Sequence, residues 1–263
     1  MYSRRLFLAG ALLGSACAST PAWAGPDGSP DIWELALPDM ERLGPSVWVK
    51  LLAPEVWITS FTFDTPDLGW VPCNGMIVGD PAGATIIDTG NTYAQGALIL
   101  GAAKRLTGKP AKQAVATHSH GDRTGGIAAM RAERVPVFAH PFSVGLALTY
   151  GERVPEPVQG LEKGPVALGP VELFYPGAGH TRDNITVWHQ ASGTLFGGCL
   201  LRATTDNQIG SLGDADIDAY PVTLERLAKR YPNRRFVIPG HGSAAGDGLV
   251  WTQDRVKEAI AKR

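Results

Sequence analysis

The sequence predicts an α/β protein in which two mixed β-sheets pack face to face with helices outside, an αββα four-layer sandwich. Of its 263 residues, 44% are hydrophobic, which is enough for a large buried core. The two halves of the chain also share one coarse order, because each is rich in short strands and ends in a helix followed by a strand. Each sheet of such a pair has two apolar faces to bury, and helices are expected to cover the outer ones.

The first half is expected to start as a series of hairpins, because short apolar runs alternate with turn signals such as GDPAGA. A helix is expected over residues 92–108, where Gly108 and the nearby Pro110 end the apolar pattern. The expected strands of this half span residues 47–52, 56–63, 74–80, 84–90 and 113–117.

The second half repeats strands followed by helices. One helix is expected from about residue 214 to residue 231, with Pro221 in its first half, and a last helix over 248–262. The expected strands span residues 171–175, 185–189, 194–198 and 235–239.

The first 24 residues have the pattern of a secretory signal peptide. Arg4 and Arg5 precede an apolar stretch, and small residues end it at Ala24, where cleavage is expected. The arginine pair also resembles a twin-arginine export signal. The stretch is too short to span a membrane, so we expect it to be removed and the protein to be periplasmic. The mature chain, residues 25–263, is expected to form a single domain and to be a monomer.

Charge and cysteine content narrow the function classes. Of 24 basic and 25 acidic residues, cleavage removes two arginines and no acid, which leaves 22 basic and 25 acidic side chains and a formal charge of −3. This charge balance lacks the excess of basic residues that is typical of nucleic-acid-binding proteins. The mature chain keeps Cys73 and Cys199, for which one disulfide is the simplest interpretation in an exported protein.

The stretch ATHSHGDRTGG sets His118, His120 and Asp122 at alternate positions directly behind an apolar strand. Alternate side chains of an extended segment project the same way, so the two imidazoles are expected to lie close together. Imidazole and carboxylate are standard zinc ligands, which indicates a metal site. The alternative is a solvated turn that caps a helix beginning near Thr124.

Three further residues of the kinds that bind metals follow strands in the second half. His180, Cys199 and His241 each come after an apolar strand and a glycine, which lets the backbone approach closely. Their recurrence strengthens the metal interpretation. His140 and His189 have no second ligand type beside them and are expected to be structural.

The motifs HSHGDRTGG, GAGHTRDNITVW, FGGCLL and IPGHG, in this order, resemble those of a class B, subclass 1 metallo-β-lactamase. The resemblance covers nearly all of the mature chain. Many other enzymes of the same superfamily have a histidine ligand where this chain has Arg123, and the cysteine after GG is similarly typical of lactamases. The resemblance therefore implies the metallo-β-lactamase fold.

The resemblance implies two zinc ions per chain, the first bound by His118, His120 and His180. Zinc lowers the pKa of its bound water to about 7, and the resulting hydroxide would attack the β-lactam carbonyl with Asp122 orienting it. Penicillins, cephalosporins and carbapenems are the expected substrates, with antibiotic resistance as the result. The second zinc would be held by Asp122, Cys199 and His241, which would leave Cys73 as a buried free thiol.

Substrate contacts are also implied. Arg202, three residues after the cysteine, would hold the carboxylate of the antibiotic. Ser211 stands where many relatives have an asparagine that supports the carbonyl oxygen, and Asn207 is a candidate to replace it.

The stretch FDTPDLGW matches the flap that relatives fold over a bound antibiotic, with Phe63, Leu68 and Trp70 as its apolar candidates. Trp70 could equally belong to the core. Asp88 and Arg123 are expected behind the metal ligands, where they would orient them without touching the ions.

Two other functions stay open at this stage. One is a dizinc hydrolase of the same superfamily that acts on a lactone or thioester. The other is a non-catalytic periplasmic zinc-binding protein whose open coordination positions are unused. None of the three requires a nucleic acid or a stable membrane association.

Overall fold

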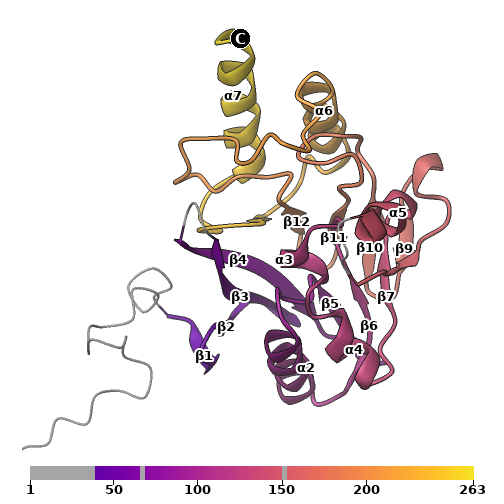
Figure 1. The fold of residues 1–263 in the computed structure, drawn as a ribbon. Helices are drawn as coiled ribbons and strands as arrows, with labels where there is room; N and C mark the ends of the chain where they lie inside the picture. Colours follow the sequence, from indigo (N-terminus) through magenta and orange to yellow (C-terminus); the bar gives the residue numbers. More distant parts are fainter. Residues whose placement is uncertain (1–38, 66–68, 150–152) are drawn as a thin grey trace, which may run out of the picture. The chain divides into compact units, whose positions relative to one another are not determined.

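The computed structural model describes residues 39–65, 69–149 and 153–263, of which Met40–Arg263 form one compact unit (Figure 1). The expected signal peptide, its cleavage after Ala24 and the start of the mature domain lie outside the described residues. Within the described part of the chain, no helix is long and apolar enough to cross a membrane.

The first sheet is built from the first half of the chain. Its strands are arranged in sequence order; the first five pair antiparallel and the remaining neighbours pair parallel. Among the described residues the strands are β1 (Glu41–Gly44), β2 (Val47–Ala53), β3 (Val56–Thr65), β4 (Gly69–Val78), β5 (Ala84–Ile87), β6 (Ala111–Val115), β7 (Val137–Ala139) and β8 (Glu156–Pro157).

The second sheet comes from the second half and has the order β13-β12-β11-β10-β9 in the described chain. Only β12 and β13 pair parallel, so each half contains a parallel step after a helix. The strands are β9 (Val166–Leu168), β10 (Val171–Phe174), β11 (Thr186–His189), β12 (Thr194–Gly198) and β13 (Phe236–Pro239).

Helices lie against both sheets. In the first half, α2 (Tyr93–Thr107) and α4 (Ile127–Ala132) lie beside β5 and β6, and in the second half α6 (Tyr220–Arg230) and α7 (Gly248–Ala261) lie together near β12 and β13 (Figure 1). The described chain also has the short α3 (Gly121–Thr124), α5 (Pro141–Thr149) and the 3₁₀ turn η1 (Leu161–Lys163).

Successive side chains along the strands pack on opposite faces of each sheet, and their contacts show how the layers are arranged. In the first sheet Ile86 packs with α2, whereas the next residue, Ile87, packs against the second sheet. In the second sheet Phe196 lies in this same inter-sheet core, whereas Leu195 packs with α6 and α7. Three apolar cores between four layers confirm the expected αββα sandwich.

The ends of α2 are the ones that the sequence predicts, whereas α6 starts later than predicted. Thr92 accepts a hydrogen bond from the Gln95 N–H at 3.2 Å, and Gly108 ends α2 with a φ of 70°, as expected. The helix expected from residue 214 instead begins at Tyr220, because Pro221 fits only the first turn of a helix.

Candidate metal centre

The predicted ligands lie on loops that leave strands of both sheets. His118 and His120 follow β6 of the first sheet, whereas His180, Cys199 and His241 follow β10, β12 and β13 of the second. The site is therefore assembled from both halves of the chain.

Two glycines allow these loops to pack closely. A Cβ on Gly240 would lie 2.5 Å from the backbone nitrogen of Cys199. Gly198 has a φ of 55°, and its Cβ would lie 2.8 Å from the Thr117 hydroxyl. Side chains at either position would separate the loops that carry the ligands.

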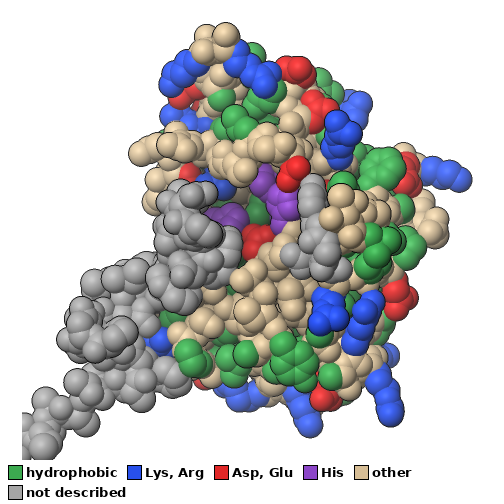
Figure 2. Space-filling view, in the orientation of Figure 1, with side chains coloured by type: hydrophobic (Ala, Val, Ile, Leu, Met, Phe, Trp, Pro, Cys, Tyr) green, Lys and Arg blue, Asp and Glu red, His purple; other side chains and the backbone are tan. Residues whose placement is uncertain are grey.

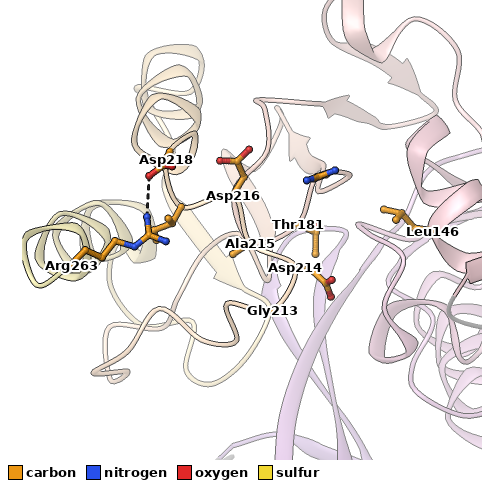
Figure 3. A pocket seen from close by; sticks show the side chains of 10 residues that line it. Leu146, Thr181, Gly213, Asp214, Ala215, Asp216, Asp218 and Arg263 are labelled. Carbon is orange, nitrogen blue, oxygen red and sulfur yellow. Dashed lines mark hydrogen bonds and ion pairs between the residues drawn. The ribbon is translucent and has the colours of Figure 1, made fainter.

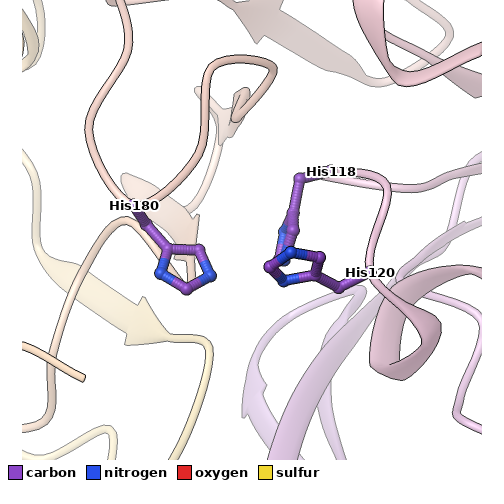
Figure 4. A group of neighbouring side chains, drawn as sticks. All are labelled: His118, His120 and His180. Atoms are coloured by element: carbon purple, nitrogen blue, oxygen red, sulfur yellow. The ribbon is translucent and has the colours of Figure 1, made fainter. Parts of the chain in front are cut away.

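Three histidines form the first cluster (Figure 4). The ring of His118 lies 4.6 Å from that of His120 and 5.0 Å from that of His180, centroid to centroid, and all three rings meet edge to face. One nitrogen of each ring lies within 4.8 Å of the others. In the space-filling view, histidine and acidic side chains appear together in a hollow of one face (Figure 2).

The chemistry of this cluster fits a metal ion. Among the described residues, neither ring nitrogen of the fully buried His118 has a hydrogen-bond partner, and Nδ1 of His180 has none either. A buried polar atom left in this way costs about 1–3 kcal/mol. Burial lowers the pKa of His118 well below the ordinary value and that of His180 to about 3, so both are neutral and offer lone pairs.

Asp214 belongs to this cluster and was missed by the sequence analysis. Its Oδ2 lies 2.9 Å from Nε2 of His120 and fixes the orientation of that ring. Asp214 comes from the loop before α6, 94 residues along the chain, and no local motif connects it with His120.

Asp214 also opens onto a cavity of about 470 Å³ (Figure 3). Thr181, the neighbour of the predicted ligand His180, lines it as well. An ion pair of 3.0 Å between Asp218 and Arg263 lies at its other end.

The second cluster contains Asp122, Cys199 and His241. Cys199 Sγ lies 3.1 Å from Nε2 of His241 and 3.8 Å from Oδ2 of Asp122, and the last two atoms are 3.4 Å apart. The Nδ1–H of His241 donates to the carbonyl of Pro72 at 3.0 Å, which leaves Nε2 as the lone-pair nitrogen toward the other two. Burial lowers the pKa of His241 to about 4.

Cys73 adjoins the same cluster. Its Sγ lies 3.8 Å from Oδ2 of Asp122 and 3.5 Å from Nδ1 of His241. Both Cys73 and Cys199 are free and buried, so the disulfide interpretation is wrong for this structure. Burial raises the pKa of Cys199 to about 12 in the ion-free chain.

Arg123 holds the second cluster together. Its Nη2 lies 2.8 Å from Asp122 Oδ2, 2.8 Å from Cys199 Sγ and 3.2 Å from His241 Nε2, so a protein cation already lies among these three side chains. The guanidinium is completely buried. Burial acts to raise the pKa of Asp122, but the attraction of Arg123 together with that of His241, His120 and His180 outweighs it, and the pKa is lowered.

Asp88 supports Arg123 from behind. It lies 3.1 Å from Nη1 of Arg123 and accepts hydrogen bonds from the Thr117 backbone N–H at 2.8 Å and hydroxyl at 3.0 Å. Burial raises its pKa to about 7 in spite of the guanidinium. Asp88 therefore connects the loop after β5 with the loop that carries His118.

The residues predicted to contact the substrate do not form a cluster like those of the predicted metal ligands. Arg202 forms an ion pair of 2.6 Å with Asp206, and Asn207 and Ser211 are exposed on the same loop. Leu68 lies outside the described residues, as do the side chains of Phe63 and Trp70.

The two histidines expected to be structural lie outside both clusters. Nδ1 of His140 accepts the Phe142 backbone N–H at 3.2 Å, and Nδ1 of His189 contacts the Ser192 hydroxyl at 2.8 Å.

Comparison with known proteins identifies the family. The family model described as "Metallo-beta-lactamase superfamily" matches residues 68–254. The chain belongs to the metallo-β-lactamase superfamily. It is 31% identical over 212 residues to a metallo-beta-lactamase type 2 of Bacteroides fragilis, covering 80% of this chain and 84% of that protein. It is also 31% identical over 225 residues to one of Pseudomonas aeruginosa, covering 83% and 85%.

Solved structures of this superfamily share the architecture. A metallo-β-lactamase from Erythrobacter litoralis, with β-mercaptoethanol in its active site, matches with a TM-score of 0.79 and 32% identity, covering 84% of this chain and 100% of that one. FIM-1 from Pseudomonas aeruginosa, in its mono-zinc form, matches with a TM-score of 0.77 and 32% identity, covering 81% and 96%.

Proposed function

We propose that this protein is a class B, subclass 1 zinc β-lactamase that hydrolyses the amide bond of β-lactam antibiotics, carbapenems included. One observation carries the proposal. The buried His118, with both ring nitrogens unpartnered in the described structure, lies beside two further histidines and next to an Asp–Cys–His set. This is the donor set that a hydrolytic zinc centre needs.

Two zinc ions per chain are part of the proposal. His118, His120 and His180 would hold the first, and Asp122, Cys199 and His241 the second. When bound, zinc supplies a Lewis acid for the carbonyl oxygen and makes water a nucleophile at neutral pH. The order of the ligand types along the chain and the similarity to relatives named metallo-beta-lactamase type 2 support this assignment.

Asp122 has the central role among the residues of the chain. Its lowered pKa keeps the carboxylate ionised, and it interacts electrostatically with both His120 and His241. A carboxylate in this place can accept a hydrogen bond from the attacking water and orient it toward the carbonyl carbon. Asp214 orients His120 from the side of the cavity.

Arg202 would bind the carboxylate of the antibiotic. In the structure its guanidinium is paired with Asp206, so substrate binding requires the substrate carboxylate to compete with or join that pair. Ser211 and Asn207, on the same exposed loop, would contact the carbonyl side of the substrate, and Phe63, Leu68 and Trp70 would cover it.

Export to the periplasm completes the proposal. Residues 1–24 would be removed as a signal peptide of the twin-arginine type, leaving a monomeric domain of residues 25–263. Export after folding would keep Cys199 reduced, which suits a thiolate ligand.

The test is hydrolysis of a carbapenem by the purified protein, followed by chelation and zinc add-back. We expect turnover that a chelator abolishes and zinc restores. A lactone and a thioester, assayed in parallel, separate the β-lactamase from other hydrolases of the superfamily. Bound zinc without turnover of any of the three would contradict an enzymatic function.

A further inference from the structure

We propose that Tyr220, the first residue of α6, is a positioning residue that holds one ligand loop of each metal site in place. The inference rests on the proposed function, because it requires one ion at the three-histidine position and another at the Asp–Cys–His position. Tyr220 lies outside the ligand motifs, and its role follows from its contacts with the residues beside two of the predicted ligands.

The hydroxyl of Tyr220 reaches the loop that carries Cys199. It donates a hydrogen bond of 2.7 Å to the carbonyl of Leu200, the residue directly after this predicted ligand. Tyr220 and Leu200 are both fully buried, so water cannot replace this donor at the carbonyl. Burial also raises the pKa of Tyr220 above its usual range, so the hydroxyl keeps its proton and remains a donor.

The ring of Tyr220 reaches the loop that carries His180. A Cβ on Gly179, the residue directly before this predicted ligand, would lie 2.9 Å from Cδ2 and 3.1 Å from Cε2 of the ring. The ring therefore packs directly on the backbone of Gly179. Leu200 packs on the same glycine, since the same Cβ would lie 2.5 Å from its Cδ1. The two ligand loops thus meet at Gly179, and Tyr220 contacts both of them.

Backbone hydrogen bonds hold Tyr220 in this place. Its N–H donates to the carbonyl of Asp216 at 3.0 Å, and the N–H of Asp216 donates to the carbonyl of Gly179 at 2.9 Å. Asp214, which contacts His120, lies in the same loop before α6. This loop is therefore connected to the surroundings of two first-site ligands, and it ends at Tyr220, which connects it with the second site.

The two parts of the Tyr220 side chain act on different ions. The hydroxyl restricts the backbone beside Cys199, and the ring restricts the backbone beside His180. Zinc–ligand bonds of about 2.0–2.3 Å leave little room for displacement, so a ligand on a poorly fixed loop binds its ion less tightly. The hydroxyl should therefore matter for the second ion and the ring for the first.

Removal of the hydroxyl separates these two effects. Tyr220→Phe keeps the ring on Gly179 and removes the donor to Leu200, so affinity for the second ion should fall about 10-fold while affinity for the first stays within about twofold. Competition with a chromophoric chelator measures both affinities. In the cobalt(II) protein, the near-ultraviolet absorption of a bound thiolate identifies the site that holds Cys199. Tyr220→Leu, which also loses the ring, should weaken both sites.

Tyr231, at the other end of α6, provides the matched control. Its hydroxyl donates to Oε1 of Glu172 at 2.8 Å, and the residue is buried. Tyr231→Phe removes a comparable hydrogen bond away from both clusters, so it should lower the melting temperature about as much as Tyr220→Phe does. Both metal affinities should stay within about twofold of the original, which separates positioning of the ligands from general stability.

A loss of second-ion affinity in Tyr220→Phe, with none in Tyr231→Phe, would support the positioning role. Equal affinities in Tyr220→Phe and the unaltered protein, or the same loss in both variants, would overturn it and leave the proposed function intact. An unaltered protein that binds zinc at neither position would overturn both.

Discussion

The three-histidine cluster and the Asp–Cys–His cluster differ in how the protein compensates their buried polar atoms. In the first, both ring nitrogens of His118 and Nδ1 of His180 are buried and lack hydrogen-bond partners among the described residues. In the second, Nη2 of Arg123 already contacts Asp122 and Cys199 at 2.8 Å. The unpartnered nitrogens of the first cluster suit a bound metal ion, whereas the polar atoms of the second cluster already contact a protein cation.

The largest effect is expected from removing the core of the first cluster. His118→Ala should lower the zinc content by one ion per chain and reduce carbapenem turnover by more than about 100-fold, because the remaining two histidines cannot hold the ion. Metal analysis and steady-state kinetics measure the two effects. Full zinc content in this variant would contradict the first site.

Removing the guanidinium should expose the difference between the clusters. Arg123→Ala leaves Asp122 buried without its cation, which should destabilise the ion-free protein by about 3–5 kcal/mol. Zinc should then raise the melting temperature of the variant more than that of the unaltered protein, since no protein cation lies among the ligands.

The exposed Arg235 provides a matched control for this experiment. Arg235→Ala should change both melting temperatures by only a small amount. Equal zinc responses in Arg123→Ala and the unaltered protein would show that the guanidinium does not oppose the second ion.

A smaller effect is expected at Asp214. Asp214→Asn keeps the shape of the side chain but weakens the contact with His120, and affinity for the first ion should fall about 10-fold while the second is unchanged. Competition with a chromophoric chelator measures both affinities. A loss confined to the second ion would contradict the assignment of Asp214 to the first cluster.

The smallest effect on metal is expected at His140, a buried histidine outside both clusters. His140→Gln should leave zinc affinity within about twofold of the original and cost about 1 kcal/mol of stability through the Phe142 contact. Burial lowers the pKa of His140, so protons bind preferentially to the unfolded chain. Stability is then present above the ordinary histidine pKa and lost as the pH falls below about 6.5, and this acid sensitivity should be smaller in the variant.

The sequence predicted the features that depend on short segments. His118, His120 and Asp122 lie within five residues of one another, at the end of the loop after β6 and the start of α3. The apolar runs before His180, Cys199 and His241 also lie within a few residues of them, so the local pattern was sufficient to predict the two sheets and to select candidate ligands. The caps of α2 at Thr92 and Gly108 were local in the same way.

The remaining features depend on long-range packing. Asp214 meets His120 across 94 residues, and Cys73 meets His241 across 168. The contact of Arg123 with Cys199 spans 76 residues and requires both halves to be folded. The residues next to each member of such a pair in the sequence do not indicate which distant residue it will contact. The late start of α6 was a local error, since Pro221 already indicated a helix start.

The backbone at Asp88 has a consequence for protein engineering. Its φ of 60° is unusual for a residue with a side chain, and glycine would adopt it without strain. Glycine would nevertheless be a poor replacement, because losing the carboxylate would leave the buried Arg123 guanidinium and the Thr117 donors without their partner, at a cost of about 3–5 kcal/mol against about 1–3 kcal/mol of backbone strain. Libraries screened only for thermal tolerance should therefore retain aspartate at this position in spite of its strained backbone.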